Sequence, residues 1–160
     1  MENEDVLNLI YPPPWVAKLL YAFISGAQQR TPQGIKAELI YFVLPLLATD
    51  IIKDRLVKAK SSSSFYSIFE NKMRDKKEYS VDLSERIHSF TGVTNNGLIY
   101  LGNDERLQVG EYISVSKPIK LAQYKVSKDY DYLRSSFYLG LIFAKEDHLN
   151  IFLKLGVILR

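Results

Sequence analysis

The stretch Leu39–Ala48, with the sequence LIYFVLPLLA, decides how this chain folds because none of its side chains is charged. Charged residues close both ends, with Lys36 and Glu38 before the stretch and Asp50 after it. The stretch is about half as long as the roughly 20 residues that a membrane-spanning helix needs. The sequence therefore predicts a helix that is buried in protein and apolar on all sides.

Pro45 interrupts this helix. Proline lacks a backbone N–H and disfavours helical geometry at the preceding residue, so we expect a kink or a break near Leu44. The helix is expected to begin near Ile35 and to continue beyond the proline to Val57. Its partner is an amphipathic helix over residues 15–28. These two helices form an N-terminal helical pair within residues 1–60. Residues 1–10, at its start, are expected to be a flexible lead-in, a short strand or a turn.

Residues 61–116 have the order of a winged helix-turn-helix. A serine of the tract Ser61–Ser64 is expected to cap a short helix, and a helix that buries Leu83, Ile87 and Phe90 follows. A turn at Gly92 and a second helix capped by Thr94 come next. Two short strands about Gly110 then form the wing.

Residues 117–160 predict a C-terminal helical unit. One helix carries an apolar stripe, and the last helix is expected to present Leu149, Phe152 and Leu153 on its apolar face. The predicted fold is therefore a single domain over residues 1–160 that is mainly α with a small β-hairpin. It combines a winged-helix-like helical domain with C-terminal helices.

Composition limits the classes of function. The chain has no cysteine, which excludes disulfides and thiolate metal sites, and its net charge of +3 is mild. The start, Met1–Asp5, is acidic where a secretory signal would be basic. We therefore expect a cytoplasmic protein that does not enter a membrane.

The sequence contains no recognisable catalytic or metal-binding motif. Its two histidines, His88 and His148, lack a second ligand at metal-binding spacing. Carboxylate pairs such as Asp82 with Glu85 are explained as solvated faces or helix caps. We therefore predict no catalytic residue, no cofactor and no metal, and we predict that the protein is not an enzyme.

Nucleic-acid binding is the alternative, because the winged-helix outline suggests it. The expected reading helix, residues 95–103, has no Lys or Arg, which makes base reading by it improbable. The basic segments 53–60 and 72–77 could instead contact a DNA backbone without sequence preference, although charges that solubilise the ends of apolar helices are the favoured explanation. The candidate contacts in the second segment are Lys72, Arg74, Lys76 and Lys77.

Several segments together resemble a known family. They are YFVLPLL at 41–47, SIFEN at 67–71, SERI at 84–87, FYLGLIFAK at 137–145 and IFLKLGV at 151–157. This set is similar to the middle component of bacterial three-component ABC-ATPase systems, the class that includes Lamassu-type anti-phage defence. The resemblance implies an accessory subunit without catalytic residues. Its partners would be a Rad50- or SMC-like ABC ATPase and an effector, often a nuclease, with DNA reached through the complex.

An adaptor of this kind needs anchors for its partners. Aromatic side chains dominate the energetics of protein interfaces, because they bury a large area at a small entropic cost. The candidate interface residues are Trp15, Tyr66, Tyr100 and Tyr112.

Overall fold

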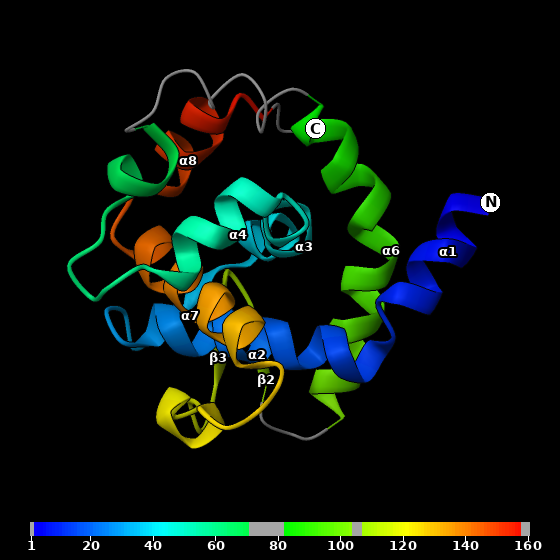
Figure 1. Cartoon of the computed structure of the whole chain (residues 1–160), viewed down its shortest axis with the longest axis horizontal. Coiled ribbons are helices and arrows are strands. Elements are labelled where there is room, and N and C mark those ends of the chain that lie inside the picture. Colours follow the sequence, from blue (N-terminus) through cyan, green and yellow to red (C-terminus); the bar gives the residue numbers. More distant parts are fainter. Residues whose placement is uncertain (1, 71–81, 104–106, 158–160) are drawn as a thin grey trace.

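The computed structural model describes residues 2–70, 82–103 and 107–157, and the side chains from Val6 onward (Figure 1). The mainly helical fold with a small β-hairpin that the sequence predicts is confirmed. The elements in chain order are α1 (Glu2–Ile10), α2 (Pro13–Gln28), β1 (Ile35–Lys36), the 3₁₀ helix η1 (Ala37–Phe42), α3 (Val43–Leu47), α4 (Asp50–Val57), the π-helix η2 (Tyr66–Glu70), α6 (Leu83–Gly102), β2 (Leu107–Val109), β3 (Tyr112–Val115), the 3₁₀ helix η3 (Leu121–Tyr124), α7 (Tyr130–Ala144) and α8 (His148–Leu155).

Helix α2 lies at the centre of the fold and touches α7 backbone to backbone. A Cβ atom on Gly26 would lie 1.8 Å from the carbonyl oxygen of Phe137, and a Cβ on Gly140 would lie 1.9 Å from that of Phe23. On the α6 side, a Cβ on Gly97 would lie 2.2 Å from Val16. Side chains at these three positions would push the helices apart, so glycine sets their spacing.

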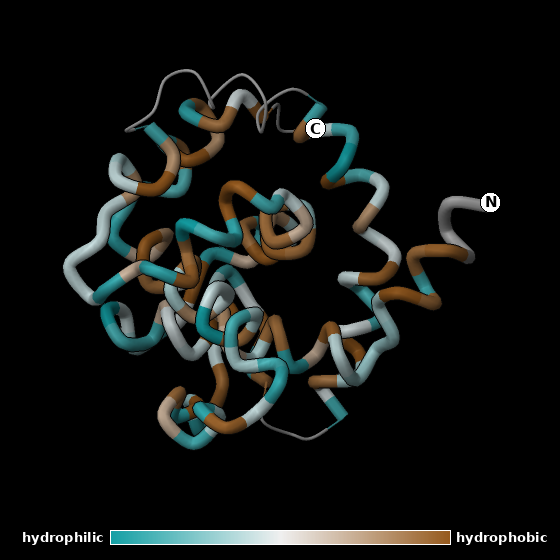
Figure 2. The backbone as a smooth tube through the Cα atoms, viewed as in Figure 1, coloured by the Kyte–Doolittle hydropathy of each residue, from teal (hydrophilic) through white to brown (hydrophobic). Residues whose placement is uncertain are grey.

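The burial predicted for the central apolar run is confirmed. Every residue from Leu39 to Leu47 is buried except the half-buried Tyr41. Figure 2 shows this run as a hydrophobic coil around α3, surrounded by the other helices. Its rings also pack, since Phe42 meets Phe143 of α7 and Phe152 of α8 edge to face.

The prediction of one kinked helix from Ile35 to Val57 is wrong. The chain forms β1, the 3₁₀ helix η1 and then the short helices α3 and α4. Pro45 is the third residue of α3. The first turn of a helix has no internal partners for its N–H groups, so a proline there removes nothing that the helix needs. The chain therefore accommodates Pro45 by starting a new α-helix at Val43.

Arg86 joins α6 to the end of α3. Its Nη1 donates to the hydroxyl of Thr49 at 2.6 Å and to the carbonyl of Pro45 at 3.3 Å, and the Thr49 hydroxyl donates to that same carbonyl at 3.0 Å. Burial lowers the pKa of the Arg86 guanidinium, while the carboxylate of Asp82 acts in the opposite direction. The last carbonyls of a helix have no partner within the helix. At the end of α3, Arg86 and Thr49 supply hydrogen bonds to one of them, the carbonyl of Pro45.

The predicted hairpin about Gly110 is confirmed, and it gains a third strand. β3 pairs antiparallel with β2 and with β1, giving the order β1-β3-β2. β1 is registered with Ile35 opposite Ile113. Lys36 of the same strand forms an ion pair with Glu111 at 2.6 Å, and this hydrogen bond raises the pKa of Lys36 and lowers that of Glu111.

The predicted turn at Gly92 is wrong, and so is the helix cap at Thr94. Residues 83–102 form the single helix α6, with both residues in its interior. A glycine inside a helix costs only about 1 kcal/mol, and α6 offsets that cost by burying a face that includes Phe90, Val93 and Leu101. The helix-turn-helix of a winged helix is therefore not formed in residues 83–115.

Three further local predictions have different outcomes. The start of the chain is the helix α1, not a lead-in or strand. The serine cap is confirmed, because the backbone N–H of Ser67 donates to the Ser64 hydroxyl and that of Ser64 donates to the Ser67 hydroxyl. The predicted N-cap Ser80 and the segment 72–77 lie outside the described residues.

Replacing Gly26 by alanine tests the close α2–α7 contact. The added methyl group has no space beside the Phe137 carbonyl, so we expect a loss of about 1–3 kcal/mol or more in the free energy of unfolding. Chemical denaturation followed by far-UV circular dichroism measures it.

Gly102→Ala is the matched control, because a Cβ there meets its nearest neighbour at 3.9 Å. In that position, the higher helix propensity of alanine should leave stability unchanged or raise it by up to about 1 kcal/mol. Equal unfolding midpoints for the two variants would contradict the backbone contact.

Candidate partner interface

Two of the four candidate aromatic residues are half-buried. Trp15, at the start of α2, packs edge to face with Tyr132 of α7 at a centroid distance of 5.8 Å. Next to it, Tyr11 meets Phe90 of α6 at 5.3 Å, and burial, followed by the nearby Tyr132, raises the pKa of the Tyr11 phenol. Trp15 thus helps to hold α2 to α7, and its role as a partner contact stays a prediction.

Tyr112 of β3 is also half-buried, and Lys36 Nζ lies 5.3 Å above its ring. Tyr66 and Tyr100 are more accessible, with exposed fractions of 59% and 46%. Tyr66 belongs to η2 and Tyr100 to the far end of α6, which lie on opposite sides of the molecule (Figure 1). The structure does not bring the four candidates together on one surface.

Helix α1 carries an exposed apolar stripe that the sequence analysis missed. Val6, Leu9 and Ile10 are all exposed, Leu9 to 83%, and we call them the α1 stripe. Leu7 packs on the core, and the backbone N–H of Tyr11 donates to its carbonyl. The signal in the sequence was the acidic first turn, Glu2 to Asp5, followed by apolar residues at helical spacing.

Helix α8 carries a second exposed stripe. The prediction that Leu149 and Leu153 belong to the buried face is wrong: the buried residues are Ile151, Phe152 and Leu155. Leu149 and Leu153 follow each other at i, i+4 on the outside, and Leu153 is 77% exposed. These two residues are the α8 stripe. In Figure 1, α8 and α1 lie on opposite sides of the central helices.

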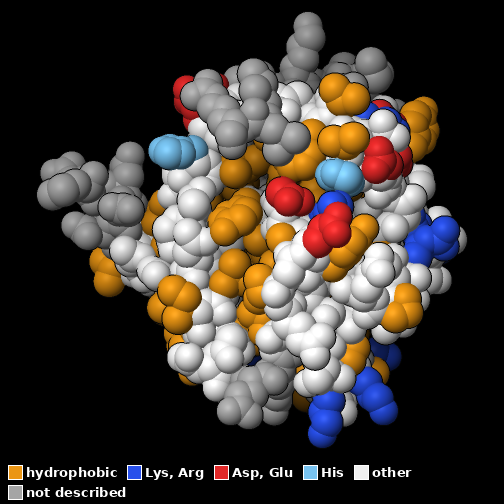
Figure 3. Space-filling model, turned by 180° about the vertical axis from the view of Figure 1, so that it is seen from behind, with side chains coloured by type: hydrophobic (Ala, Val, Ile, Leu, Met, Phe, Trp, Pro, Cys, Tyr) orange, Lys and Arg blue, Asp and Glu red, His pale blue; other side chains and the backbone are white. Residues whose placement is uncertain are grey.

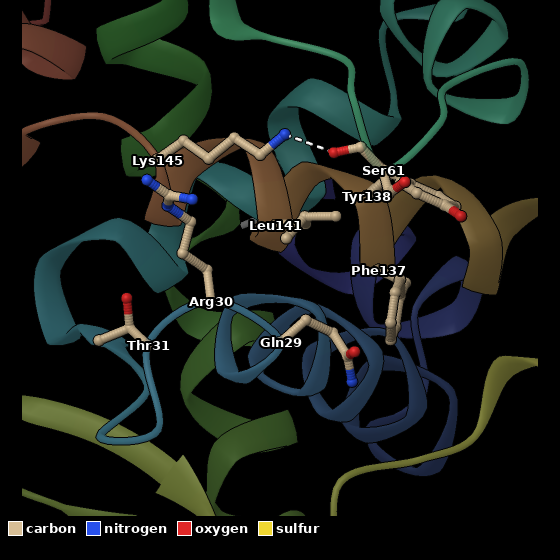
Figure 4. A pocket seen from close by; sticks show the side chains of 8 residues that line it. All are labelled: Gln29, Arg30, Thr31, Ser61, Phe137, Tyr138, Leu141 and Lys145. Atoms are coloured by element: carbon tan, nitrogen blue, oxygen red, sulfur yellow. Dashed lines mark hydrogen bonds between the residues drawn. The ribbon is translucent and has the colours of Figure 1, made fainter.

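A cleft of about 620 Å³ lies between the end of α2, the loop that follows it, and α7 (Figure 4). Lys145 reaches across it and donates to the carbonyls of Ser61 and Ser63 at 2.5 and 2.9 Å. Arg30 extends toward the same side of the cleft. The described residues that line it include two cations, Arg30 and Lys145, and no carboxylate or histidine.

The two histidines and the carboxylates of the described residues do not form a cluster. No group of His, Asp or Glu side chains in the described part of the chain is arranged to hold a metal ion. His88 is exposed on α6, and Nδ1 of His148 lies 3.5 Å from the carboxylate of Asp147. Among the described helices, none is long and apolar enough to span a membrane. What the surface offers is apolar helix faces suited to protein contacts.

These features define a small helical protein with exposed apolar residues on two of its helices. The chain belongs to a family of middle components: the family model described as "ABC-three component (ABC-3C) system Middle Component 3" matches residues 2–159. Comparisons with curated proteins and with solved structures find no match. The resemblance stated from the sequence is thus confirmed at the level of the three-component family.

Alanine variants of Trp15 and Tyr66 separate a structural aromatic residue from a surface one. Trp15→Ala removes a half-buried ring and its contact with Tyr132, so we expect a loss of about 2 kcal/mol in the free energy of unfolding. Tyr66→Ala should change it by less than about 0.5 kcal/mol. Thermal unfolding of both variants checks this, and equal destabilisation would show that Tyr66 is held by the core.

Proposed function

We propose that this chain is a non-catalytic adaptor subunit of an anti-phage defence complex of the Lamassu type. It joins a Rad50- or SMC-like ABC ATPase to an effector nuclease in the cytoplasm. The observation that carries the proposal is the match to a middle-component family over residues 2–159. A component of such a system has partner components by definition, and we take the two exposed apolar stripes of this chain as the candidate surfaces for binding them.

The α1 stripe and the α8 stripe suit this role. Exposed apolar residues that follow one helix face are typical of helix-mediated protein contacts. Because the two stripes lie on opposite sides of the body, two partners can bind at the same time without competing. Between them, the close α2–α7 and α2–α6 contacts make a body that resists deformation.

The mechanism that we propose is coupling by contact. Movement of the ATPase heads, driven by ATP and DNA, changes the fit at one stripe and shifts the adaptor relative to the effector on the other. Such coupling needs contacts that differ between the two states of the complex, and it needs no chemistry from the adaptor. The effector stays inactive until the shift occurs.

The winged-helix alternative receives no support from the fold. Its reading helix is part of the continuous helix α6, and Lys72, Arg74, Lys76 and Lys77 lie outside the described residues. It predicts that neutralising these four side chains abolishes salt-sensitive binding to plain duplex DNA, which gel retardation measures. Binding that is indifferent to the four changes would count against it.

Native co-purification tests the adaptor. The tagged chain, expressed from its own operon, should recover a large coiled-coil ATPase in fixed ratio together with an effector, as identified by mass spectrometry. Recovery of the chain alone, or with DNA alone, would contradict the proposal.

Charge substitutions in each stripe test whether the two surfaces are separate. Leu9→Glu should remove one partner and Leu153→Glu the other, because a carboxylate in an apolar contact must be desolvated. Val109→Glu places the same charge on an exposed strand outside both stripes and should keep both partners. All three should unfold within a few degrees of the natural protein. Retention of both partners by both stripe variants would rule out these interfaces.

A further inference from the structure

A third surface, distinct from both stripes, carries a concentration of positive charge. Residues 116–128 contain lysines at positions 117, 120, 125 and 128 and no acidic residue, and all four lysines are exposed. We call this the lysine segment. It includes η3 and projects from the lower edge of the molecule, where Figure 3 shows Lys and Arg side chains gathered. Next to it, Lys18 of α2 lies 3.8 Å from Asp129.

The backbone of this segment is fixed by one polar face of α2. The side-chain amide of Gln28 donates to the carbonyl of Val115 at 3.1 Å and accepts from its N–H at 2.8 Å. The Tyr21 hydroxyl donates to the carbonyl of Lys117, and the N–H of Ile119 donates to the Ser25 hydroxyl at 2.9 Å. Ile119 is buried at this attachment.

This attachment leaves the lysine side chains free. None of the four forms a hydrogen bond or ion pair within the described part of the chain that would neutralise it. A cleft of about 520 Å³ lies against the segment, and its lining includes Tyr21 of α2 and Lys117, Lys120 and Tyr124 of the segment. A polyanion that binds here meets positive charge on a backbone that is already ordered, so the entropy lost on binding is that of the lysine side chains and not of the main chain.

We propose that the lysine segment binds the phosphate backbone of duplex DNA. Its cations are all lysines, which act as point charges and carry no base-reading geometry. Lysine is depleted in protein interfaces, whereas phosphate neutralisation uses it readily. The segment therefore fits a nucleic-acid backbone better than an acidic protein surface. It differs from the basic segments 53–60 and 72–77, and its assignment does not depend on the adaptor function.

Fluorescence anisotropy with a labelled duplex of random sequence tests the proposal, using the full chain over a series of NaCl concentrations. The first variant combines Lys117→Gln, Lys120→Gln and Lys125→Gln. We expect it to bind at least about tenfold more weakly at low salt, and to flatten the slope of log Kd against log salt by about 2–3. Far-UV circular dichroism confirms that the variant is folded.

Two variants of equal charge serve as controls. One combines Arg30→Gln, Lys58→Gln and Lys60→Gln, all exposed positions away from the segment. The other neutralises Lys72, Arg74 and Lys76. Both should bind duplex within about threefold of the natural chain, since they remove net charge but not these phosphate contacts.

Three results would overturn the proposal. In the first, the natural chain does not bind duplex DNA at low salt. In the second, the three variants weaken binding equally, which would mean that net charge alone explains the effect. In the third, polyglutamate competes as well as unlabelled duplex, which would assign the segment to an acidic protein partner. The adaptor function is tested apart from DNA binding by co-purification of the lysine variant. We expect this variant to recover the same partners as the natural chain.

Discussion

The fold depends on the backbone of α2 lying in direct contact with that of α7. Gly26 and Gly140 permit this, because each leaves room for a carbonyl oxygen of the other helix where a side chain would otherwise stand. At this spacing Ser136 of α7 donates to the carbonyl of Leu19 at 2.6 Å. Helix α6 closes on α2 through Gly97, and the apolar run packs against the resulting helices. The glycines at the helix crossings thus set the spacing of α2, α6 and α7, and the larger side chains of the core pack within that spacing.

Much of this fold follows from local patterns that the sequence displays. The charge-free run around Pro45 predicts its own burial, and Gly110 between two short strand-forming runs predicts the hairpin. Features that depend on distant residues were not predictable in the same way. Strand β1 is too short to have a pattern, and it forms because β3 offers a free edge. Gly92 indicates a turn locally, but the packing of the whole α6 face favours a continuous helix.

The candidate interface was less predictable than the fold, for a related physical reason. Periodicity shows that a helix has an apolar face, but not whether the chain itself covers that face. In α8, both Phe152 and Leu153 are apolar, and the aromatic contact with Phe42 selects the first for the core. Residue type likewise marks Trp15 as a candidate anchor, but it does not show that one side of the ring packs on Tyr132. What the core leaves uncovered, on α1 and α8, is what supports the adaptor proposal.

The lysine segment is attached to α2 by its main chain, with Tyr21, Ser25 and Gln28 contacting peptide groups. Peptide groups are the same whatever side chains they carry. The outward residues of this edge can therefore be exchanged without altering its attachment, apart from the buried Ile119. Substituting the outward lysines therefore changes the charge that this edge presents to solvent while the hydrogen bonds that hold it to α2 remain.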